Sequence, residues 1–483
     1  VITTKSGRGK KSFIEADANF GTNMALLPRY ETISSPEQYI ALGWEGLYNR
    51  GAAIGNADPV KYANDRLFST SGVRPGYNMW NVANGGELID PLTKSVRPGV
   101  TRKYTPENWE DFAFQNSARR EYNVKFGGSS GRTSFFSSFG YLDDQGYSIN
   151  SDYERLTGRV NLRQEIKEWL TGGINISYAR SETNTNGQTS DSGSIFWFVD
   201  NMPSIYPLFR RDAEGNIIED PIFGGPQYDY GAEGDYARGF GGLTNSIADA
   251  TYNTRRDNRD EINGNANLDF TLMKGLTFEN RLGVQYYHNK YGWLNNKYYG
   301  SSAGQQGALG LTRTDRFSYN LLNMLRYNTA IGQHGLEVLA AHEASNFKQN
   351  IFSASGYRLV DPNLLELSNA VVKNPTQNSY TDQYALESYF GQINYDFAKK
   401  YFLSTTIRRD GSSRFRDDKW GTFGSVGAAW VVSNEDFMSS QSALSSLKLK
   451  ASYGLIGDQA GVGYYPGYDL YSVDNVNNQP GFT

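Results

Sequence analysis

Hydrophobic and polar side chains alternate with a period of two over long segments of this chain. In residues 389–397, Tyr389, Gly391 and Ile393 take one parity, whereas Gln392 and Asn394 take the other. A period of two indicates a β-strand whose two faces differ. A strand that crosses a bilayer has about 9–11 residues, whereas an ordinary strand has about 5–6 residues. Many of these segments are close to the longer length. The pattern therefore predicts strands that are long enough to cross a membrane.

Short turns and long loops alternate between these segments. The triplets KEW (167–169), MKG (273–275) and AKK (398–400) predict tight turns, whereas residues 410–419 form a longer, charged loop. This rhythm is typical of an up-and-down transmembrane barrel. The predicted fold is all-β, a transmembrane antiparallel β-barrel with short periplasmic turns and long extracellular loops.

About 13 segments carry the alternation, and no closing strand is visible. Because lipid does not tolerate the open edges of such a sheet, we expect further strands outside this sequence. The predicted strands are residues 13–20, 120–126, 135–141, 155–166, 170–178, 262–272, 276–286, 317–327, 336–342, 387–397, 401–409, 421–432 and 447–455.

Two connections are far longer than a normal loop. The first spans about 95 residues after residue 20 and contains two predicted helix starts, Ser35-Pro36-Glu37 and Thr105-Pro106-Glu107. Each start places a cap, a first-turn proline and an acid before apolar residues. The second connection is residues 180–256, and a shorter loop is predicted at 288–311. Both are rich in aromatic residues.

These aromatic loops supply the candidate ligand contacts, Trp197, Tyr206, Phe209 and Trp293. Aromatic side chains suit ligand pockets, because they give a broad contact area and carry few charges. The alternative interpretation is structural, since Tyr and Trp also line barrel rims and fill the small cores of large loops.

Composition narrows the chemistry. The net charge of −4 gives no sign of a nucleic-acid surface, and the absence of cysteine excludes disulfides and thiolate chemistry. The histidines, His288, His334 and His342, lack metal-ligand spacing, so no metal or other cofactor is predicted. The run from Asp212 to Asn216 lacks the full twelve-residue calcium pattern and is interpreted as a hairpin turn. With no catalytic motif either, the protein is not expected to be an enzyme.

Several motifs carry a family resemblance. VITTKSG at the start resembles the last plug strand of SusC/RagA-type TonB-dependent outer-membrane transporters. The stretch from NWEDF to NISYA is similar to the first barrel hairpins of that family, and IRRDGSSRF, SNEDF and LKLKASYGLIGDQ resemble its mid-barrel signature. Gly424 and Asp458 depart from the proline and asparagine that are usual there. The resemblance implies that residues 1–10 end a plug domain, and that residues 11–483 form the N-terminal and middle part of a barrel of about 22 strands.

The resemblance also implies a function. A member of this family would sit in the outer membrane of a Gram-negative bacterium as a multi-pass barrel, in contact with membrane lipid and lipopolysaccharide. It would import an oligosaccharide or peptide too large for porins, with a SusD-like surface lipoprotein and a TonB complex that acts through a region not in this chain.

Two alternatives were weighed against this function. One is a passive or adhesive outer-membrane barrel whose loops bind a partner. The other is a soluble glycan-binding β-protein, which predicts charged outer strand faces. The apolar set Ile262, Ala266, Leu268 and Phe270 argues against the soluble protein.

Overall fold

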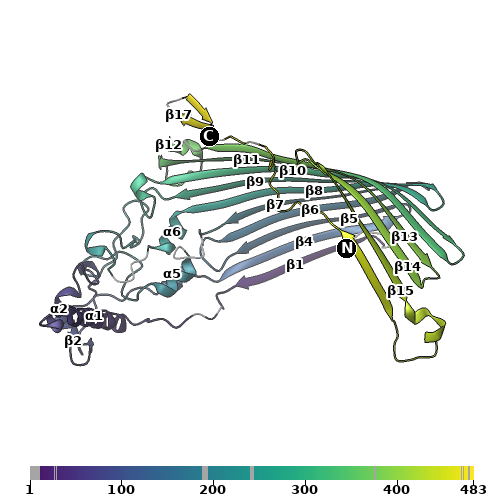
Figure 1. Cartoon of the computed structure of the whole chain (residues 1–483). Helices are drawn as coiled ribbons and strands as arrows, with labels where there is room; N and C mark the ends of the chain where they lie inside the picture. The colour runs from purple at the N-terminus through teal and green to yellow at the C-terminus, as the bar shows by residue number, and fades with distance from the viewer. Residues whose placement is uncertain are drawn as a thin grey trace.

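A computed structural model describes residues 11–26, 28, 30–187, 194–239, 244–374, 377–468, 470–471, 473–476 and 479–482. The predicted plug segment, residues 1–10, lies outside the described residues. One antiparallel sheet of 14 strands dominates the described part of the chain. Its strands run side by side in chain order and curve into a trough, as Figure 1 shows.

Thirteen of these strands follow one another along the sheet, and each of the 13 predicted segments lies in one of them, except that 421–432 and 447–455 each extend one residue beyond the observed strand. The path is β1 (Phe13–Asn23), β4 (Ser117–Ser130), β5 (Thr133–Gln145), β6 (Asp152–Lys167), β7 (Leu170–Asn184), β8 (Thr254–Met273), β9 (Leu276–Asn295), β10 (Ala308–Ile331), β11 (His334–Leu359), β13 (Asn378–Phe397), β14 (Tyr401–Ser412), β15 (Trp420–Val431) and β16 (Lys448–Leu455). The short strand β12 (Ala370–Lys373) pairs with β11, β2 (Ile89–Asp90) with β3 (Ser95–Val96), and β17 (Val473–Val476) with β18 (Gln479–Phe482).

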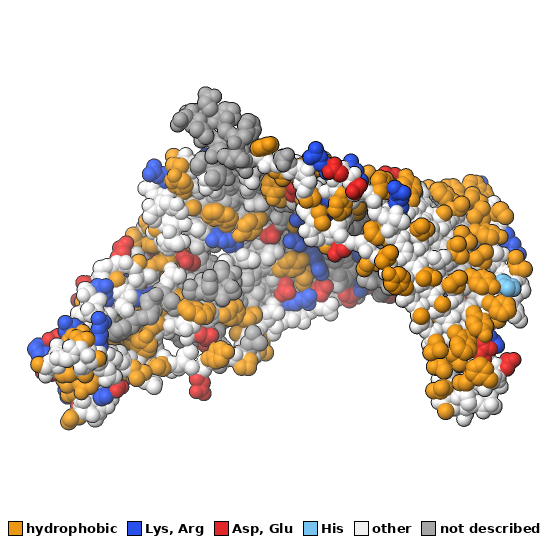
Figure 2. All heavy atoms as spheres, in the orientation of Figure 1, with side chains coloured by type: hydrophobic (Ala, Val, Ile, Leu, Met, Phe, Trp, Pro, Cys, Tyr) orange, Lys and Arg blue, Asp and Glu red, His pale blue; other side chains and the backbone are white. Residues whose placement is uncertain are grey.

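The register lines up one apolar face across the sheet. Directly paired residues share a face, so a row of partners can be followed from strand to strand. One such row is Val124, Phe139, Gly158, Tyr178, Ile262, Tyr286 and Phe317. We call this apolar face the outer face, and Figure 2 shows its hydrophobic side chains gathered over β13, β14 and β15.

The opposite face of the sheet is polar, and we call it the inner face. On β8 it carries the predicted polar set Asn263, Asn265, Asn267 and Asp269, which alternates with the apolar set of the outer face. Asn263 pairs with Gln285, and Gln285 pairs with Ser318. An apolar outer face with a polar interior is the arrangement of a transmembrane β-barrel wall.

Tight turns close one end of the sheet from β4 to β14, a longer link joins β15 to β16 there, and the long connections leave the other end (Figure 1). The predicted turns KEW, MKG and AKK lie at the tight end, where Ala398 and Lys399 both take a left-handed backbone conformation. Two successive positive φ angles give a turn whose twist matches that of the paired strands.

Several strands extend well beyond their predicted limits. The strands β10 and β11 contain 24 and 26 residues. The predicted loop 288–311 is therefore too long, because β9 continues to Asn295 and β10 begins at Ala308. Trp293 accordingly stands on a strand.

Short helices occupy the connections at the loop end. They are α1 (Pro36–Ala53), α2 (Pro59–Arg66), α3 (Gly85–Leu88), α4 (Glu110–Ala113), α5 (Ile195–Asn201) and α6 (Ser246–Tyr252), with 3₁₀ turns η1 (Pro75–Tyr77), η2 (Gly234–Tyr236), η3 (Ala303–Gln305) and η4 (Leu367–Asn369). Two more 3₁₀ turns, η5 (Val432–Asn434) and η6 (Asp436–Met438), lie at the turn end, in the connection from β15 to β16. Within the described residues, no helix combines the length and the apolar character needed to cross a membrane.

The two predicted helix starts have different outcomes. The first is confirmed, because Ser35 caps α1 by accepting a hydrogen bond from the backbone N–H of Gln38 at 3.3 Å. The second is wrong, because α4 begins only at Glu110. The acid that was expected to open that helix, Glu107, instead accepts the backbone N–H of Leu208 at 2.9 Å and pairs with Arg211.

Candidate functional site

Three aromatic side chains of β9 lie on the inner face at the loop end of the sheet. Tyr287, Tyr291 and Trp293 occupy alternate positions, so they share one face of the strand. All three are half-buried, which leaves part of each ring accessible. We call these three residues the aromatic strip.

Arginine side chains from the neighbouring strands flank the aromatic strip. The guanidinium carbons of Arg259 on β8 and Arg316 on β10 lie 5.4 and 5.1 Å from the ring centre of Tyr287. The guanidinium of Arg255 lies 5.8 Å from the ring of Trp293. Cations within about 6 Å of a ring centre attract its face. The strip is therefore an array of rings held in place by cations and able to stack on a ligand.

The inner face below the aromatic strip is polar and internally paired. A depression of about 460 Å³ is lined by Asn263, Asn265, Gln285, Asn320 and Tyr384, among others. Nearer the tight turns, Arg326 bridges Glu279 and Glu337 at 3.1 and 3.2 Å. These contacts join neighbouring strands through side chains as well as through the backbone.

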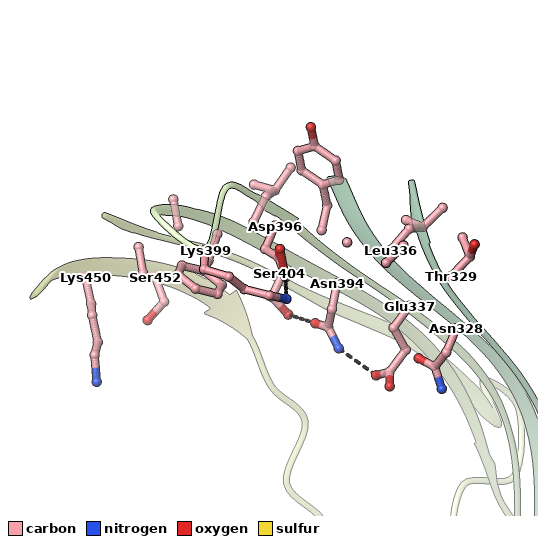
Figure 3. Close-up of a pocket in the computed structure, with 18 of the residues that line it drawn as sticks. Asn328, Thr329, Leu336, Glu337, Asn394, Asp396, Lys399, Ser404, Lys450 and Ser452 are labelled. Carbon is pink, nitrogen blue, oxygen red and sulfur yellow. Dashed lines mark hydrogen bonds and ion pairs between the residues drawn. The ribbon is translucent and has the colours of Figure 1, made fainter. Parts of the chain in front are cut away.

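A larger depression, of about 860 Å³, lies at the turn end of β10 to β16 (Figure 3). Asn394 donates to Glu337 at 2.9 Å and accepts from Ser404 at 2.6 Å, while Lys399 pairs with Asp396 at 2.5 Å. In Figure 3, Glu337 points to the side of the sheet opposite to Leu336. Because its polar groups bond to one another, this depression is not our candidate ligand site.

The long connections join into one structure at the loop end. We call the described residues of 24–116, 185–253 and 296–307 the loop assembly. Its largest core combines Trp44, Tyr77 and Trp80 of the first connection with Ile205 and Tyr206 of the second, all fully buried. Apolar burial of this extent favours the docked arrangement.

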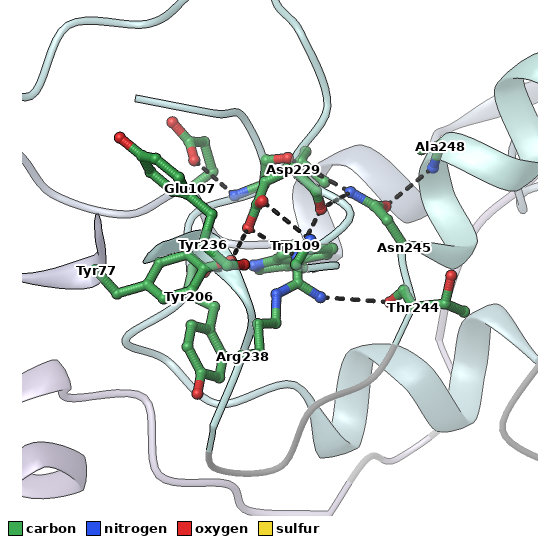
Figure 4. Close-up of polar contacts among 12 residues, drawn as sticks. Tyr77, Glu107, Trp109, Tyr206, Asp229, Tyr236, Arg238, Thr244, Asn245 and Ala248 are labelled. Atoms are coloured by element: carbon green, nitrogen blue, oxygen red, sulfur yellow. Dashed lines mark hydrogen bonds and ion pairs between the residues drawn. The ribbon is translucent and has the colours of Figure 1, made fainter. Parts of the chain in front are cut away.

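A buried ion pair lies where the first two connections meet (Figure 4). Arg238 and Asp229 are 3.0 Å apart, with side chains only 1% and 3% exposed. Tyr77 donates to the same carboxylate at 2.8 Å, and Asn245 donates to the backbone oxygen of Asp229 at 3.0 Å. Burial, followed by the charge of Asp229, raises the pKa of the Tyr77 phenol well above its ordinary value. The phenol therefore stays protonated and remains a donor at physiological pH.

Further contacts join the same two connections. Glu107 pairs with Arg211, whose guanidinium lies 4.6 Å from the ring centre of Tyr104. Trp109 donates its indole N–H to the backbone oxygen of Tyr206 at 3.0 Å. Removing one partner of a buried ion pair is strongly destabilising, because the other charge stays buried without compensation. These contacts therefore stabilise the docked arrangement of the two connections.

A tyrosine cluster joins the second connection to residues 296–307. Asp220, which is 2% exposed, accepts the hydroxyls of Tyr252 and Tyr299, each at 3.0 Å, and the backbone N–H groups of Ile222 and Phe223. Burial alone would raise the pKa of Asp220, but the backbone and tyrosine donors together lower it. Burial, followed by Asp220, raises the pKa of Tyr299 to about 12.

The structure separates the four predicted ligand contacts. Tyr206 is fully buried and Phe209 is 8% exposed, so both lie in the cores of the loop assembly. Trp197 on α5 is 40% exposed, and Trp293 lies in the aromatic strip. The structure brings Tyr206 near Arg238, whose guanidinium is 5.5 Å from its ring centre, but it does not gather the four residues into one pocket.

Sequence reasoning missed Tyr287 and Tyr291 together with their arginines. The sequence does contain a signal for them, because the alternation of a strand continues past the predicted end at residue 286. Tyr287, Asn289, Tyr291 and Trp293 occupy every second position there and so share one face. The three histidines bond to separate partners, Asp315, Tyr395 and Glu387. Across the part of the chain that is described, no three His, Asp or Glu side chains come together as a potential metal site.

No family model matches the chain. It is 25% identical over 472 residues to TonB-dependent receptor P26 of Formosa agariphila, covering 95% of this chain and 41% of that protein. It is also 25% identical over 388 residues to TonB-dependent receptor SusC of Bacteroides thetaiotaomicron, covering 76% of this chain and 36% of that protein. The chain thus spans about two fifths of the length of these relatives.

A solved structure has the same fold. The RagAB peptide transporter matches 99% of this chain and 51% of its own matched chain, with a TM-score of 0.75 and 22% identity. The same importer in an open state matches with a TM-score of 0.72. The chain therefore shares its fold with about half of that solved chain.

Proposed function

The chain belongs to the SusC/RagA family of TonB-dependent outer-membrane transporters, and from this premise we propose that it forms the ligand-receiving wall of an importer. The nutrient would be an oligosaccharide or a peptide too large for porins. The observation that carries the proposal is the aromatic strip, which stands on the polar inner face directly below the loop assembly.

The chemistry of the strip suits both ligand classes. Ring faces stack on the apolar faces of sugars and on peptide side chains, and the phenol hydroxyls add polar contacts. Arg255, Arg259 and Arg316 place cations beside the rings, where they can bond to hydroxyl, carbonyl or carboxylate oxygens. Trp197 and Trp293 remain our proposed ligand contacts from the sequence. Tyr206 and Phe209 would reach a ligand only if the loop cores opened.

We also propose a SusD-like surface lipoprotein as the partner of the loop assembly. Ile222 and Tyr298 are 47% and 39% exposed, and the ring of Tyr298 lies 6.1 Å from that of Phe223. Exposed apolar side chains on a packed scaffold favour protein contact. Energy would come from a TonB complex that acts through a region outside this chain.

Uptake of labelled nutrient tests the ligand assignment. In cells that depend on this transporter, Tyr287→Ala and Trp293→Ala should each weaken binding of the imported ligand about fivefold, since an aromatic contact contributes about 1 kcal/mol. The matched control is Tyr286→Ala, whose side chain points to the outer face. Equal uptake by the Tyr287 and Tyr286 variants would refute the role of the strip.

Two further measurements separate the alternatives. Parallel uptake of labelled oligosaccharides and peptides identifies the ligand class. Loss of uptake in cells without TonB supports active import, whereas unchanged entry would favour a passive or adhesive barrel.

Co-purification tests the partner. Ile222→Asp should release a surface lipoprotein, while Leu92→Asp, at a 92% exposed position of the first connection, should retain it. Retention of the lipoprotein by the Ile222 variant would show that this surface does not bind it.

A further inference from the structure

Two cations stand directly opposite each other on the outer face. Lys290 on β9 and Arg313 on β10 are register partners. Their other cross-strand neighbours, Asn258 and Phe352, carry no charge. Like charges placed directly opposite are destabilising unless an anion compensates them.

The acids nearby already have partners. Asp315 lies 2.6 Å from Nδ1 of His288, and Asp260 accepts the hydroxyl of Tyr178 at 2.5 Å. Within the described residues, neither Lys290 nor Arg313 makes an ion pair or a side-chain hydrogen bond. Asp315 stands two residues from Arg313 on the same face, but it makes no ion pair with either cation, so both cations remain open to an external anion.

The height of the pair identifies the source of that anion. Lys290 follows Tyr286 by four residues and Arg313 precedes Phe317 by four, and both aromatic residues are exposed on the outer face. Apolar residues further out, such as Leu294 and Leu309, are buried in a small core with Leu359 and Ala370. The cations thus stand between the exposed apolar band and this covered region, at the level of lipid headgroups.

Other cations extend the pair sideways along the same border. Arg180 on β7 lies two residues beyond Tyr178, and Lys348 on β11 is the register partner of Phe317. Both are exposed, and within the described residues neither makes an ion pair, although Arg180 is the register partner of Asp260, whereas Lys348 faces the uncharged Gln383. Lys348 and Arg180 lie four and two residues below the level of the pair, so the cations spread along the border on one face. Such a spread matches a layer of anionic headgroups better than it matches a single soluble ion.

We propose that Lys290 and Arg313 form the centre of a binding site for the phosphate groups of the outer-leaflet glycolipid, with Arg180 and Lys348 on its flanks. This inference rests on the outer-membrane placement proposed above, but it is independent of what is imported. The loop end of the sheet is thereby the end at the outer leaflet.

Lipid that remains bound after extraction of the intact transporter in mild detergent tests the site. Native mass spectrometry would count phosphorylated glycolipids on the double variant Lys290→Ser/Arg313→Ser and on the control Lys274→Ser/Lys399→Ser, which removes two cations at the turn end. The first variant should bind the glycolipid about 30-fold more weakly, since each cation near an anionic surface contributes about 1 kcal/mol. The control should bind it as the parent does, and equal binding by both variants would overturn the proposal.

Three further measurements test whether the site binds phosphorylated lipid in particular. The swap Lys290→Arg/Arg313→Lys keeps both charges and should retain the lipid, so loss of lipid there would also contradict the site. Vesicles with dephosphorylated glycolipid should not restore binding, and displacement of the lipid by equimolar inorganic phosphate would identify a free-anion site instead. Because nutrient uptake is scored separately, failure of the lipid site and failure of the import proposal are distinguishable.

Discussion

Trp293 on β9 and Gly310 on β10 are direct register partners, and the indole of Trp293 fills the space beside the glycine. A β-carbon at Gly310 would overlap Nε1 of the indole. The glycine therefore decides where the outermost ring of the aromatic strip lies.

Gly310→Ala should displace the indole and lower the affinity for the imported nutrient about fivefold, as loss of the ring would, while the barrel still assembles. Gly283→Ala is the matched control, because a β-carbon there meets its nearest neighbour at 3.4 Å on the same inner face. Ligand titration of both purified variants makes the comparison. Unchanged affinity in the Gly310 variant would show that the position of Trp293 does not matter for binding.

Asp229→Asn should loosen the loop assembly, because Arg238 would remain buried without its counter-charge. Removing one partner of a buried ion pair typically destabilises by about 3–5 kcal/mol. Asp65→Asn is the control, since its pair with Lys61 is exposed and such pairs contribute at most about 1 kcal/mol. Hydrogen exchange of residues 30–116 and 194–239 would measure the difference. Equal protection in both variants would contradict a joining role for Asp229.

The tyrosine cluster should weaken in acid. Because its donors hold the pKa of Asp220 below the ordinary value of 3.8, the carboxylate stabilises the cluster fully above that value. This stability is lost as the pH falls through the lowered pKa. Pepsin cleavage within residues 217–230 should rise below about pH 3.8, and Tyr252→Phe, which removes one donor, should move the onset to higher pH. An onset that does not move in this variant would contradict the assignment.

Leu268→Arg should destabilise the barrel by about 2–4 kcal/mol if the residue lies near the bilayer midplane, because Leu268 is on the apolar outer face. Asn267→Arg, one residue away on the polar inner face, should be tolerated far better. Folding titrations in lipid vesicles would compare the two variants. Similar destabilisation by both would mean that the two faces are misassigned.

The membrane part of the fold could be predicted from the sequence because one face of each strand contacts lipid, which is uniformly apolar. That constraint imposes strict alternation, as in Ile262, Ala266 and Leu268. Beyond the apolar band of the outer face this constraint no longer applies. His288 and Lys290 on β9 therefore occupy outward-facing positions that would be apolar inside the band. The predicted strands therefore stopped too early, and Trp293 was placed in a loop.

The interior of the loop assembly could not be predicted in the same way. Tyr77 and Asp229 are 152 residues apart in the chain, and no local pattern relates them. The aromatic residues that mark a ligand site in a sequence are the same types that fill a core. Only the docking of two distant connections separates buried Tyr206 from accessible Trp197.

The length of β11 sets how far this wall rises above the cell. Its 26 residues, at about 3.4 Å each and tilted by about 40°, span roughly 65 Å along the membrane normal. The apolar band of such a wall is only about 25 Å tall. Because the turn at its inner end adjoins apolar residues such as Leu336 and Val338, most of the remaining height projects outward. Under the proposed function, an imported nutrient would thus first meet this wall well beyond the apolar band.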